Sequence, residues 1–306
     1  MRVLITGGAG FIGSNLADRL LAQGDHVLVI DNYSTGRRDN LMPHTRLEIV
    51  EGSIGDAALV AETFARFKPE MVAHTAASYK DPEGWIEDTR TNVLGTALVV
   101  KAARAVGVRR LIYFQTALCY GGHPIEQPIT LSHPICPESS YAISKTAGEQ
   151  YIAISGLDFL SFRLANVYGP RNVSGPLPTF FHRLTTGKKC FVADSRRDFI
   201  YVDDLVSVVL KALEGRGQKG VYHVSSGSDF AIKELFDLTL EHLAMELPEP
   251  IEVRARTPDD VYSILLDPSA TARDFDWRTT TALEEGVRRT IAYYQKFGIS
   301  ETYTHL

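Results

Sequence analysis

The amino-acid sequence predicts an α/β protein: a doubly wound parallel sheet with helices on both faces, followed by a smaller α/β lobe. Two observations lead to this prediction. Short apolar runs alternate with segments of helical periodicity through the first half of the 306-residue chain, as a helix-covered parallel sheet requires. A glycine-rich segment, residues 7–13, separates the first apolar run from the first helical segment, where folds of this kind bind ligands.

The first strand is expected over residues 2–6, an apolar run that the glycines end. Gly8, Gly10 and Gly13 follow in the spacing G-x-G-x-x-G, and helical apolar spacing takes over from residue 14. Glycines at this place let the backbone turn tightly and approach a pyrophosphate at the helix N-terminus, where free amides favour anions. The segment therefore predicts a dinucleotide site in a Rossmann-type fold.

The second strand, residues 26–31, ends in an acid, Asp31. Asp31 follows Gly13 at close to the roughly 20-residue distance at which a carboxylate holds the adenosine ribose 2′-hydroxyl. A carboxylate there repels a 2′-phosphate, so NAD is expected rather than NADP.

The alternation continues beyond this point. Further strands are expected at residues 47–50, 71–74, 110–115 and 159–164, with helices at 57–67, 92–105 and around 140–154. The order of these elements supports the parallel sheet.

Tyr141 and Lys145 are four residues apart and so lie on one face of a helix, about one turn from each other. An ammonium beside a phenol favours the phenolate, so the pKa of Tyr141 is expected to fall below its ordinary value. A phenolate can take a proton from an alcohol or sugar hydroxyl. Glu149, one turn further on, is expected to be a solvated charge without a role.

Composition narrows the function classes. The formal net charge of -5 gives no reason to expect a nucleic-acid or membrane partner. Three cysteines without metal-ligand spacing, Cys119, Cys136 and Cys190, suit a reducing cytoplasm, and no metal is expected. The chain opens on a strand, and no apolar run reaches the roughly 20 residues of a membrane span, so neither a signal peptide nor a transmembrane helix is expected.

Several segments together resemble the extended short-chain dehydrogenase/reductase family, in its NAD-dependent epimerase/dehydratase branch, which acts on nucleotide-sugars. The resemblance rests on T-G-G-A-G-F-I-G-S at 6–14, D-N-x-S-x-G at 31–36, H-x-A-A at 74–77, N-V-x-G-T at 92–96, Y-x-x-x-K at 141–145, R-x-x-N-x-Y-G-P at 163–170 and R-D-F-I-Y-V-D-D at 197–204. It implies that residues 1–165 form the NAD-binding Rossmann domain, with sheet and helix elements returning near 197–225. Residues 166–306 then form mainly the nucleotide-sugar-binding lobe.

The resemblance also implies roles for individual residues. The catalytic residues would be Thr116, Tyr141 and Lys145, with Lys145 also on the nicotinamide ribose. The cofactor would be bound by Gly7, Gly10, Phe11, Ile12, Gly13, Asp31, Asn32, Ser34, Gly36, Ser53, Ile54, Thr75, Ala76, Ala77, Asn92, Tyr141 and Lys145. The substrate would be bound by Thr116, Asn166, Leu177, Arg197 and Arg256. Ser53 stands where the family usually has an aspartate that faces the adenine. For Arg197, the alternative to binding the diphosphate is an ion pair with Asp203 or Asp204.

Two positions after Thr116 separate branches of the family. Sugar 4,6-dehydratases have an aspartate and a glutamate there, whereas this chain has Ala117 and Leu118, which cannot move a proton. Epimerisation needs only the tyrosine and a hydride carrier. The resemblance therefore implies a UDP-hexose 4-epimerase that works through a transient 4-keto sugar, with Tyr141 as base.

Alternatives stay open at this point. They are a nucleotide-sugar 4,6-dehydratase, a 4-keto-sugar reductase and a non-catalytic NAD- or nucleotide-binding regulatory protein. The nucleotide, the hexose, an N-acetyl or carboxylate group on it, and the pathway, whether galactose metabolism or surface polysaccharide biosynthesis, are also open. The resemblance implies a homodimer through the helices at 92–105 and 140–154.

Overall fold

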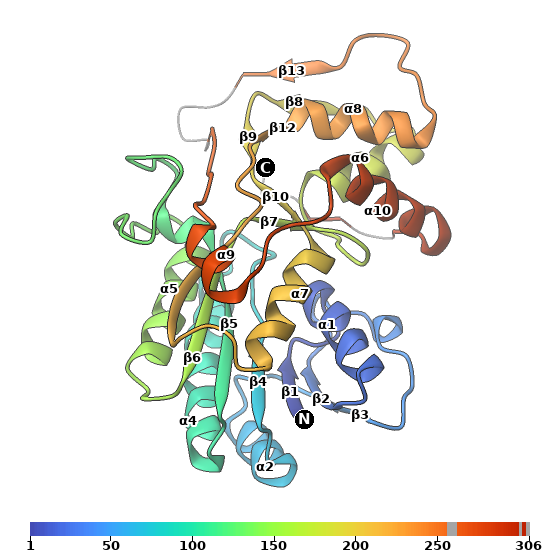
Figure 1. Cartoon of the computed structure of the whole chain (residues 1–306). Helices are drawn as coiled ribbons and strands as arrows, with labels where there is room; N and C mark the ends of the chain where they lie inside the picture. The colour runs from blue at the N-terminus through green and yellow to red at the C-terminus, as the bar shows by residue number, and fades with distance from the viewer. Residues whose placement is uncertain (256–261, 300–301, 304–306) are drawn as a thin grey trace.

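The computed structural model describes residues 1–255, 262–299 and 302–303. Seven strands form one parallel sheet in the order β11-β6-β5-β4-β1-β2-β3 (Figure 1). In chain order these strands are β1 (Arg2–Thr6), β2 (His26–Asp31), β3 (Leu47–Glu51), β4 (Met71–His74), β5 (Arg110–Thr116), β6 (Phe159–Leu164) and β11 (Gly220–Val224). The order runs outward from β1 in both directions, so the doubly wound Rossmann-type fold is confirmed.

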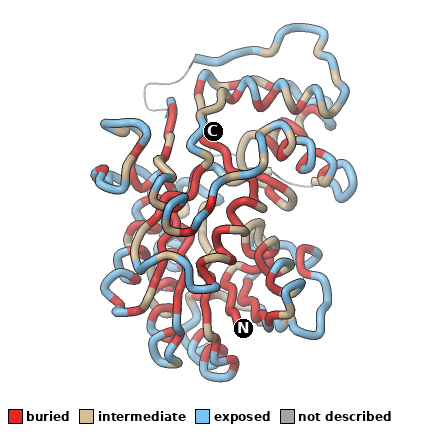
Figure 2. The backbone as a smooth tube through the Cα atoms, viewed as in Figure 1, coloured by how far each residue is buried: buried red, intermediate tan, exposed pale blue. Residues whose placement is uncertain are grey.

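Helices cover both faces of the sheet because its strands are apolar on both sides. Successive side chains of β1 point to opposite faces: Val3 and Ile5 join one core cluster, and Leu4 joins the other. The first face is covered by α1 (Phe11–Ala22) and α7 (Val202–Leu213), and the second by α2 (Ala57–Phe67), α4 (Thr96–Val106) and α5 (Ser140–Ala153). Figure 2 shows the strands buried between these layers.

A second lobe is built from the chain after β6. It contains the two-stranded pairs β10-β7, β12-β9 and β13-β8 and three longer helices. Its elements are β7 (Asn166–Tyr168), α6 (Pro176–Thr185), β8 (Phe191–Ala193), β9 (Arg196–Arg197), β10 (Phe199–Tyr201), β12 (Phe230–Ala231), α8 (Ile232–Leu243), β13 (Glu252–Arg254) and α10 (Leu283–Phe297). A further helix, α9 (Ser269–Phe275), packs on β11 and α7 of the first lobe instead. Aromatic side chains join the helices: the ring centroids of Phe180 and Phe236 are 5.0 Å apart, and those of Phe181 and Tyr294 are 5.1 Å apart.

Short helical turns connect the layers near the strand ends. They are η1 (Arg38–Asn40), α3 (Trp85–Asp88), η2 (Thr89–Gly95) and η3 (Ala117–Tyr120). The helix predicted at 92–105 begins earlier in the structure, because α3 and the π-helix η2 run without a gap into α4. Wide turns of this kind occur frequently at functional sites.

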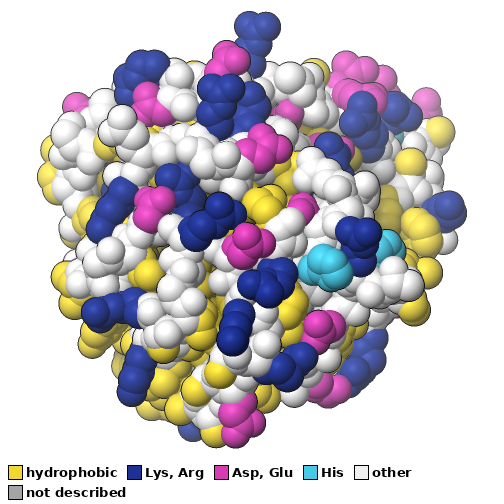
Figure 3. Space-filling model, turned by 60° about the horizontal axis from the view of Figure 1, so that its bottom comes forward, with side chains coloured by type: hydrophobic (Ala, Val, Ile, Leu, Met, Phe, Trp, Pro, Cys, Tyr) yellow, Lys and Arg dark blue, Asp and Glu magenta, His cyan; other side chains and the backbone are white. Residues whose placement is uncertain are grey.

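The described part of the chain contains no helix long and apolar enough to cross a bilayer. Within the same residues, His, Cys, Asp and Glu side chains form no group of three that could hold a metal. On the face drawn in Figure 3, basic and acidic side chains are interspersed rather than gathered into a field of one sign.

His74 is a buried histidine at the end of β4 that links three elements. Its Nδ1 lies 2.6 Å from Thr6 Oγ1, and its Nε2 lies 2.9 Å from Thr96 Oγ1. Burial, and then the charge of Lys145, lower the pKa of His74 to about 3. The unfolded chain therefore binds more protons than the folded chain between the ordinary pKa of histidine and this value, and stability is lost as the pH falls through that window.

We expect His74→Gln to flatten this acid dependence. Thermal melting of the wild type should fall steeply between about pH 6.5 and pH 4, because several kcal/mol are linked to one buried histidine. The glutamine variant should fall less, although it is less stable at neutral pH. His26→Gln is the control, since His26 is exposed at the start of β2. Equal slopes for the wild type and His74→Gln would show that His74 is not the linked group.

Candidate active site

A cavity of about 660 Å³ opens at the carboxyl ends of β1, β2, β4, β5 and β6. Its wall consists of loops that follow these strands, together with residues 171–175 after β7. The cavity includes the point between β1 and β4 from which the strand order runs in opposite directions. Open α/β sheets bind their ligands at such a switch point.

The glycine loop forms the floor of the cavity. At two of its positions no residue other than glycine fits. Gly7 has a φ of +68°, and a Cβ there would lie 2.6 Å from the Cα of Ala76. A Cβ on Gly13 would lie 2.5 Å from the carbonyl oxygen of Gly7. Gly7, Gly10, Phe11, Ile12 and Gly13 all line the cavity. The backbone therefore forms a close cradle at the N-terminus of α1, which fits the pyrophosphate of a dinucleotide.

Asp31 forms the wall at the end of β2. Its Oδ2 accepts a hydrogen bond from the Ala9 amide and its Oδ1 one from the Tyr33 amide, each at 2.8 Å. Burial raises the pKa of the Asp31 carboxyl, although the hydrogen bonds from these two amides act to lower it. Asn32 and Ser34 lie beside it on the wall, whereas Gly36 packs behind the carboxylate, where a Cβ would lie 2.9 Å from Oδ1. Each carboxylate oxygen keeps capacity to accept a ribose hydroxyl.

The remaining predicted cofactor residues divide into wall residues and a supporting residue. Ser53, Ile54, Thr75, Ala76 and Ala77 line the cavity. Asn92 is not among the described wall residues. Its Oδ1 accepts from the Ser78 amide at 2.9 Å, and its Nδ2 donates to the Ser78 carbonyl at 2.9 Å and to Ser144 Oγ at 3.0 Å. The asparagine thus fixes the loop after β4 to α5.

The predicted catalytic residues come from α5 and the end of β5. Tyr141 lies in the first turn of α5, after the Ser139 side chain caps that helix, and Tyr141 and Thr116 both line the cavity. Thr116 Oγ1 accepts from the Leu118 amide at 3.1 Å, which orients the hydroxyl at the strand end. Lys145 is buried beneath the wall, with its Nζ 3.9 Å from the centre of the Tyr113 ring.

The expected effect of Lys145 on Tyr141 is wrong for this arrangement. Burial, followed by the nearby Tyr79 and Asp88, raises the pKa of Tyr141 above its ordinary value. Burial also lowers the pKa of Lys145 to about 7, partly offset by Glu149. The sequence spacing places the two groups on one face, but it does not show that both are taken out of water. Desolvation disfavours the charged form of each group.

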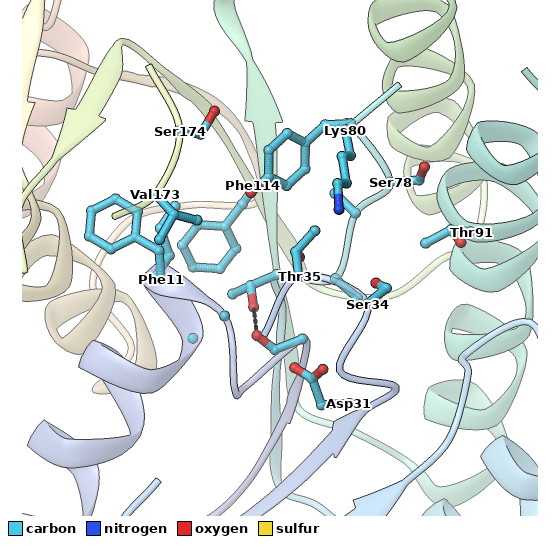
Figure 4. A pocket seen from close by; sticks show the side chains of 18 of the residues that line it. Phe11, Asp31, Ser34, Thr35, Ser78, Lys80, Thr91, Phe114, Val173 and Ser174 are labelled. Carbon is cyan, nitrogen blue, oxygen red and sulfur yellow. Dashed lines mark hydrogen bonds between the residues drawn. The ribbon is translucent and has the colours of Figure 1, made fainter. Parts of the chain in front are cut away.

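Tyr79 and Lys80 are cavity residues that the sequence analysis did not find. The Tyr79 ring lies 6.3 Å from the Tyr141 ring at a steep angle, and its hydroxyl is hydrogen-bonded to Thr35 across the cavity. Lys80 packs its ammonium 4.2 Å from the Tyr303 ring centre, and Figure 4 shows it pointing into the cavity. A usable signal existed, because both residues lie in the loop after the carboxyl end of β4, the sheet edge at which Thr116 ends β5.

The predicted substrate residues are less closely grouped. Asn166 lines the cavity, while Leu177 is buried in the second lobe and Arg197 lies on β9, neither among the described wall residues. Arg197 Nη1 donates to the carbonyls of Arg196 and Tyr262 at 2.7 and 3.3 Å. Arg256 lies outside the described residues.

The carboxylates considered as rivals for Arg197 have other contacts. Asp204 accepts from the Thr280 hydroxyl and from the backbone amides of residues 280 and 281. Asp203 lies within 4.0 Å of the Arg19 and Arg289 guanidinium groups.

Glu149 is not the solvated charge that the sequence suggested. It is buried and paired with Arg163 of β6 at 2.5 Å. Its burial depends on Arg163, a strand residue 14 positions further along the chain, so no local pattern in the helix reveals it.

Comparison with known proteins gives a consistent picture. The family described as "NAD dependent epimerase/dehydratase family" matches residues 3–225. The solved structure of WbmH from Bordetella bronchiseptica in complex with NAD+ is 54% identical, with a TM-score of 0.94 over 97% of this chain and 99% of that one. WbmG of the same organism, in complex with NAD and UDP, is 47% identical, with a TM-score of 0.93 over 100% and 98%. A UDP-glucose 4-epimerase of Mycolicibacterium smegmatis is 33% identical over 96% of this chain and 99% of the relative.

Proposed function

Since the chain belongs to the NAD-dependent epimerase/dehydratase family, we propose that it is a nucleotide-sugar epimerase, specifically a UDP-hexose 4-epimerase. The observation that supports this most is the combination of Tyr141 and Thr116 on one cavity wall with the glycine cradle. Ala117 and Leu118 occupy the first turn of η3, where a dehydratase has its two carboxylates. At these two positions the chain therefore has no side chain that could serve as the acid or the base for removing water, while Tyr141 can act as base for an alcohol.

The proposed chemistry is the reversible oxidation of the sugar at C4. NAD, when bound, would supply the acceptor and donor of the hydride and the positive charge of its nicotinamide ring. Tyr141, as phenolate, takes the proton of the 4-hydroxyl and later returns it. The Thr116 hydroxyl holds the reacting oxygen, and the Lys145 ammonium stabilises negative charge at the phenolate. The 4-keto sugar turns over in the cavity between the two halves of the cycle, so its other face is reduced.

We assign the two ligands to different parts of the chain. Residues 1–165, with the elements that return near 197–225, hold NAD, and residues 166–306 hold mainly the nucleotide-sugar. Asn166 on the cavity wall supports the second assignment. Arg197 stays a proposed diphosphate ligand, since a guanidinium forks onto phosphate oxygens.

Asp31 should make the protein selective for NAD. Cofactor released by denaturing the purified protein should be NAD without NADP, because the carboxylate repels a 2′-phosphate. Asp31→Asn should lower the preference for NAD over NADP by about tenfold or more, measured from the two dissociation constants. Glu51→Gln is a matched control, because Glu51 is the register partner of Asp31 on the neighbouring strand but is exposed. Release of NADP from the wild type would overturn the assignment.

The function itself is tested by incubating the purified protein with UDP-, GDP- and dTDP-hexoses and examining the products by NMR. Two epimers of a UDP-hexose should reach an equilibrium mixture, with no net NADH. Net consumption of NAD(H) would indicate a reductase, and a dehydrated product would indicate a 4,6-dehydratase. A protein that binds the ligands and converts none of them would be the regulatory alternative.

We also propose a homodimer that forms through the helices at 92–105 and 140–154, which are η2, α4 and α5 in the structure. Leu94 on η2, Ile143 and Tyr151 on α5, and Ile154 directly after α5 are exposed apolar side chains, which supports an interface there. Sedimentation of the purified protein at twice the monomer mass would agree with it.

A reducing cytoplasm is the compartment we propose, on the ground that all three cysteines are free.

A further inference from the structure

Glu149 extends the catalytic face of α5 by one turn. Tyr141, Lys145 and Glu149 are spaced four residues apart and so lie on one side of the helix. The Glu149 side chain is 7% exposed, and both of its oxygens are bound. Oε1 accepts from Arg163 Nη2 at 2.5 Å, and Oε2 accepts from Ser161 Oγ at 2.5 Å and Arg163 Nε at 3.3 Å.

The other arm of the same guanidinium reaches the turn that follows Thr116. Arg163 Nη1 donates to the Tyr120 hydroxyl at 2.7 Å, and Tyr120 is the last residue of η3, the turn capped by Thr116. The Tyr120 oxygen also lies 2.6 Å from Nε2 of His223 on β11. One buried arginine therefore joins the helix that carries Tyr141 and Lys145 to the turn that carries Thr116.

Stability alone gives a weak reason for such a pair. Removing two charges from water costs several kcal/mol per ion, and apolar side chains of similar volume are often equally or more stable. Arg110 and Asp158 make a comparison at the opposite ends of β5 and β6, where their ion pair at 2.9 Å is partly exposed. The buried pair lies beside the catalytic residues, and the partly exposed pair lies far from them along the strands.

We propose that Glu149 is a positioning residue: with Arg163 it holds α5 against the end of β5, and it places a negative charge one turn from the Lys145 ammonium. The proposal rests on the proposed function, in which Tyr141, Lys145 and Thr116 act on one sugar hydroxyl. Its consequence is that loss of the pair misplaces the three groups relative to each other and weakens the charge of Lys145.

The charged and titratable neighbours of this region are consistent with that role. Lys145 faces His74 from β4 and Tyr113 from β5, and Tyr141 faces Asp88 from α3. Glu149 faces Arg163 from β6 and Cys119 and Tyr120 from η3. Among these groups, Glu149 is the carboxylate that raises the pKa of Lys145, against burial, which lowers it to about 7.

The test uses full-length protein loaded with NAD and three variants. Glu149→Gln removes the negative charge. The double variant Glu149→Gln/Arg163→Met removes both charges, so it leaves no unpaired buried ion if the single variant fails to fold. The matched control is Asp158→Asn/Arg110→Met at the other end of the same strands.

In the folded Glu149 variants, kcat should fall roughly 10- to 100-fold, because small misplacements of reacting groups have effects of that size, and KM should change little. In Glu149→Gln the basic limb of the kcat–pH profile should move down by about one pH unit, because Lys145 loses its nearby opposite charge while Arg163 stays charged. NMR titration of the Lys145 ammonium, assigned with Lys145→Met, should show the same shift independently of turnover. The control variant should lose stability and keep both the profile and the titration.

A wild-type kcat in the folded double variant would overturn the proposal, even if its melting temperature fell. An unchanged Lys145 titration in folded Glu149→Gln would overturn it as well. If the wild type converts no sugar, the proposed function fails instead, and the Lys145 titration still decides the role of Glu149.

Discussion

Replacing Tyr141 with phenylalanine should abolish most of the activity while the protein stays folded and keeps NAD. The ring remains, so the contact with Tyr79 and the packing of α5 are retained. The oxygen that takes the proton of the sugar hydroxyl is lost, and general-base catalysis of this kind contributes roughly 10²–10⁴-fold. The measurement is kcat for epimer interconversion, together with the NAD content of the purified variant.

Tyr79→Phe is the matched control for this experiment. It removes a second phenol hydroxyl from the same cavity, 6.3 Å away between ring centres, without touching the proposed base. We expect its kcat to change by less than about tenfold, since it loses a hydrogen bond to Thr35 rather than the proton acceptor. If both variants lost activity equally, or if Tyr141→Phe kept wild-type activity, Tyr141 would not be the base.

Lys145→Met should lower activity and raise stability. Methionine has a similar length and no charge, so the stabilisation of the phenolate is lost, and kcat should fall about 10²-fold or more. The same substitution should raise stability, because the buried ammonium of Lys145 destabilises the folded chain. The pKa of Lys145 is about 7 in the folded chain, below the value of 10.5 for a free lysine.

The burial of Lys145 also makes the stability of the folded chain depend on pH. The unfolded chain binds more protons than the folded chain between about pH 7 and the ordinary pKa of lysine, so wild-type stability is gained as the pH rises through that window. At and below pH 7 the full cost of burying the ammonium remains. Lys145→Met should therefore melt at a higher temperature than the wild type at neutral pH, and the difference should shrink toward pH 10. A variant that loses both activity and stability at every pH would show that Lys145 has mainly a structural role.

Much of the fold could be predicted from the sequence because each element obeys a local rule. Apolar runs of four to seven residues define β1, β2, β4 and β5, and the glycine loop marks where β1 ends. The π-helical turns of η2, within the helix expected at 92–105, could not be predicted, because apolar periodicity does not distinguish them from an α-helix. The hydrogen bonds of Asn92 to Ser78 and Ser144 could not be predicted either, because these partners are distant in sequence.

In the site, too, some features could be predicted from the sequence and others could not. Residues that end a strand, such as Asp31 and Thr116, or follow one directly, such as Thr75, could be placed on the cavity because parallel strands end at one edge. The protonation of Tyr141 and Lys145 could not, since desolvation depends on everything packed around them. The burial of Glu149 could not be predicted for the same reason: its partner Arg163 lies on β6, the strand that follows α5 in the chain.

The central claim, a hydride taken from and returned to the same sugar carbon, is tested most directly with a UDP-hexose that carries deuterium at C4. In ordinary water the wild type should produce both epimers with the label still at C4, and in D₂O an unlabelled substrate should gain no carbon-bound deuterium. Loss of the label to solvent, deuterium appearing at C3 or C5, or a 4-keto-6-deoxy product would contradict the proposed mechanism.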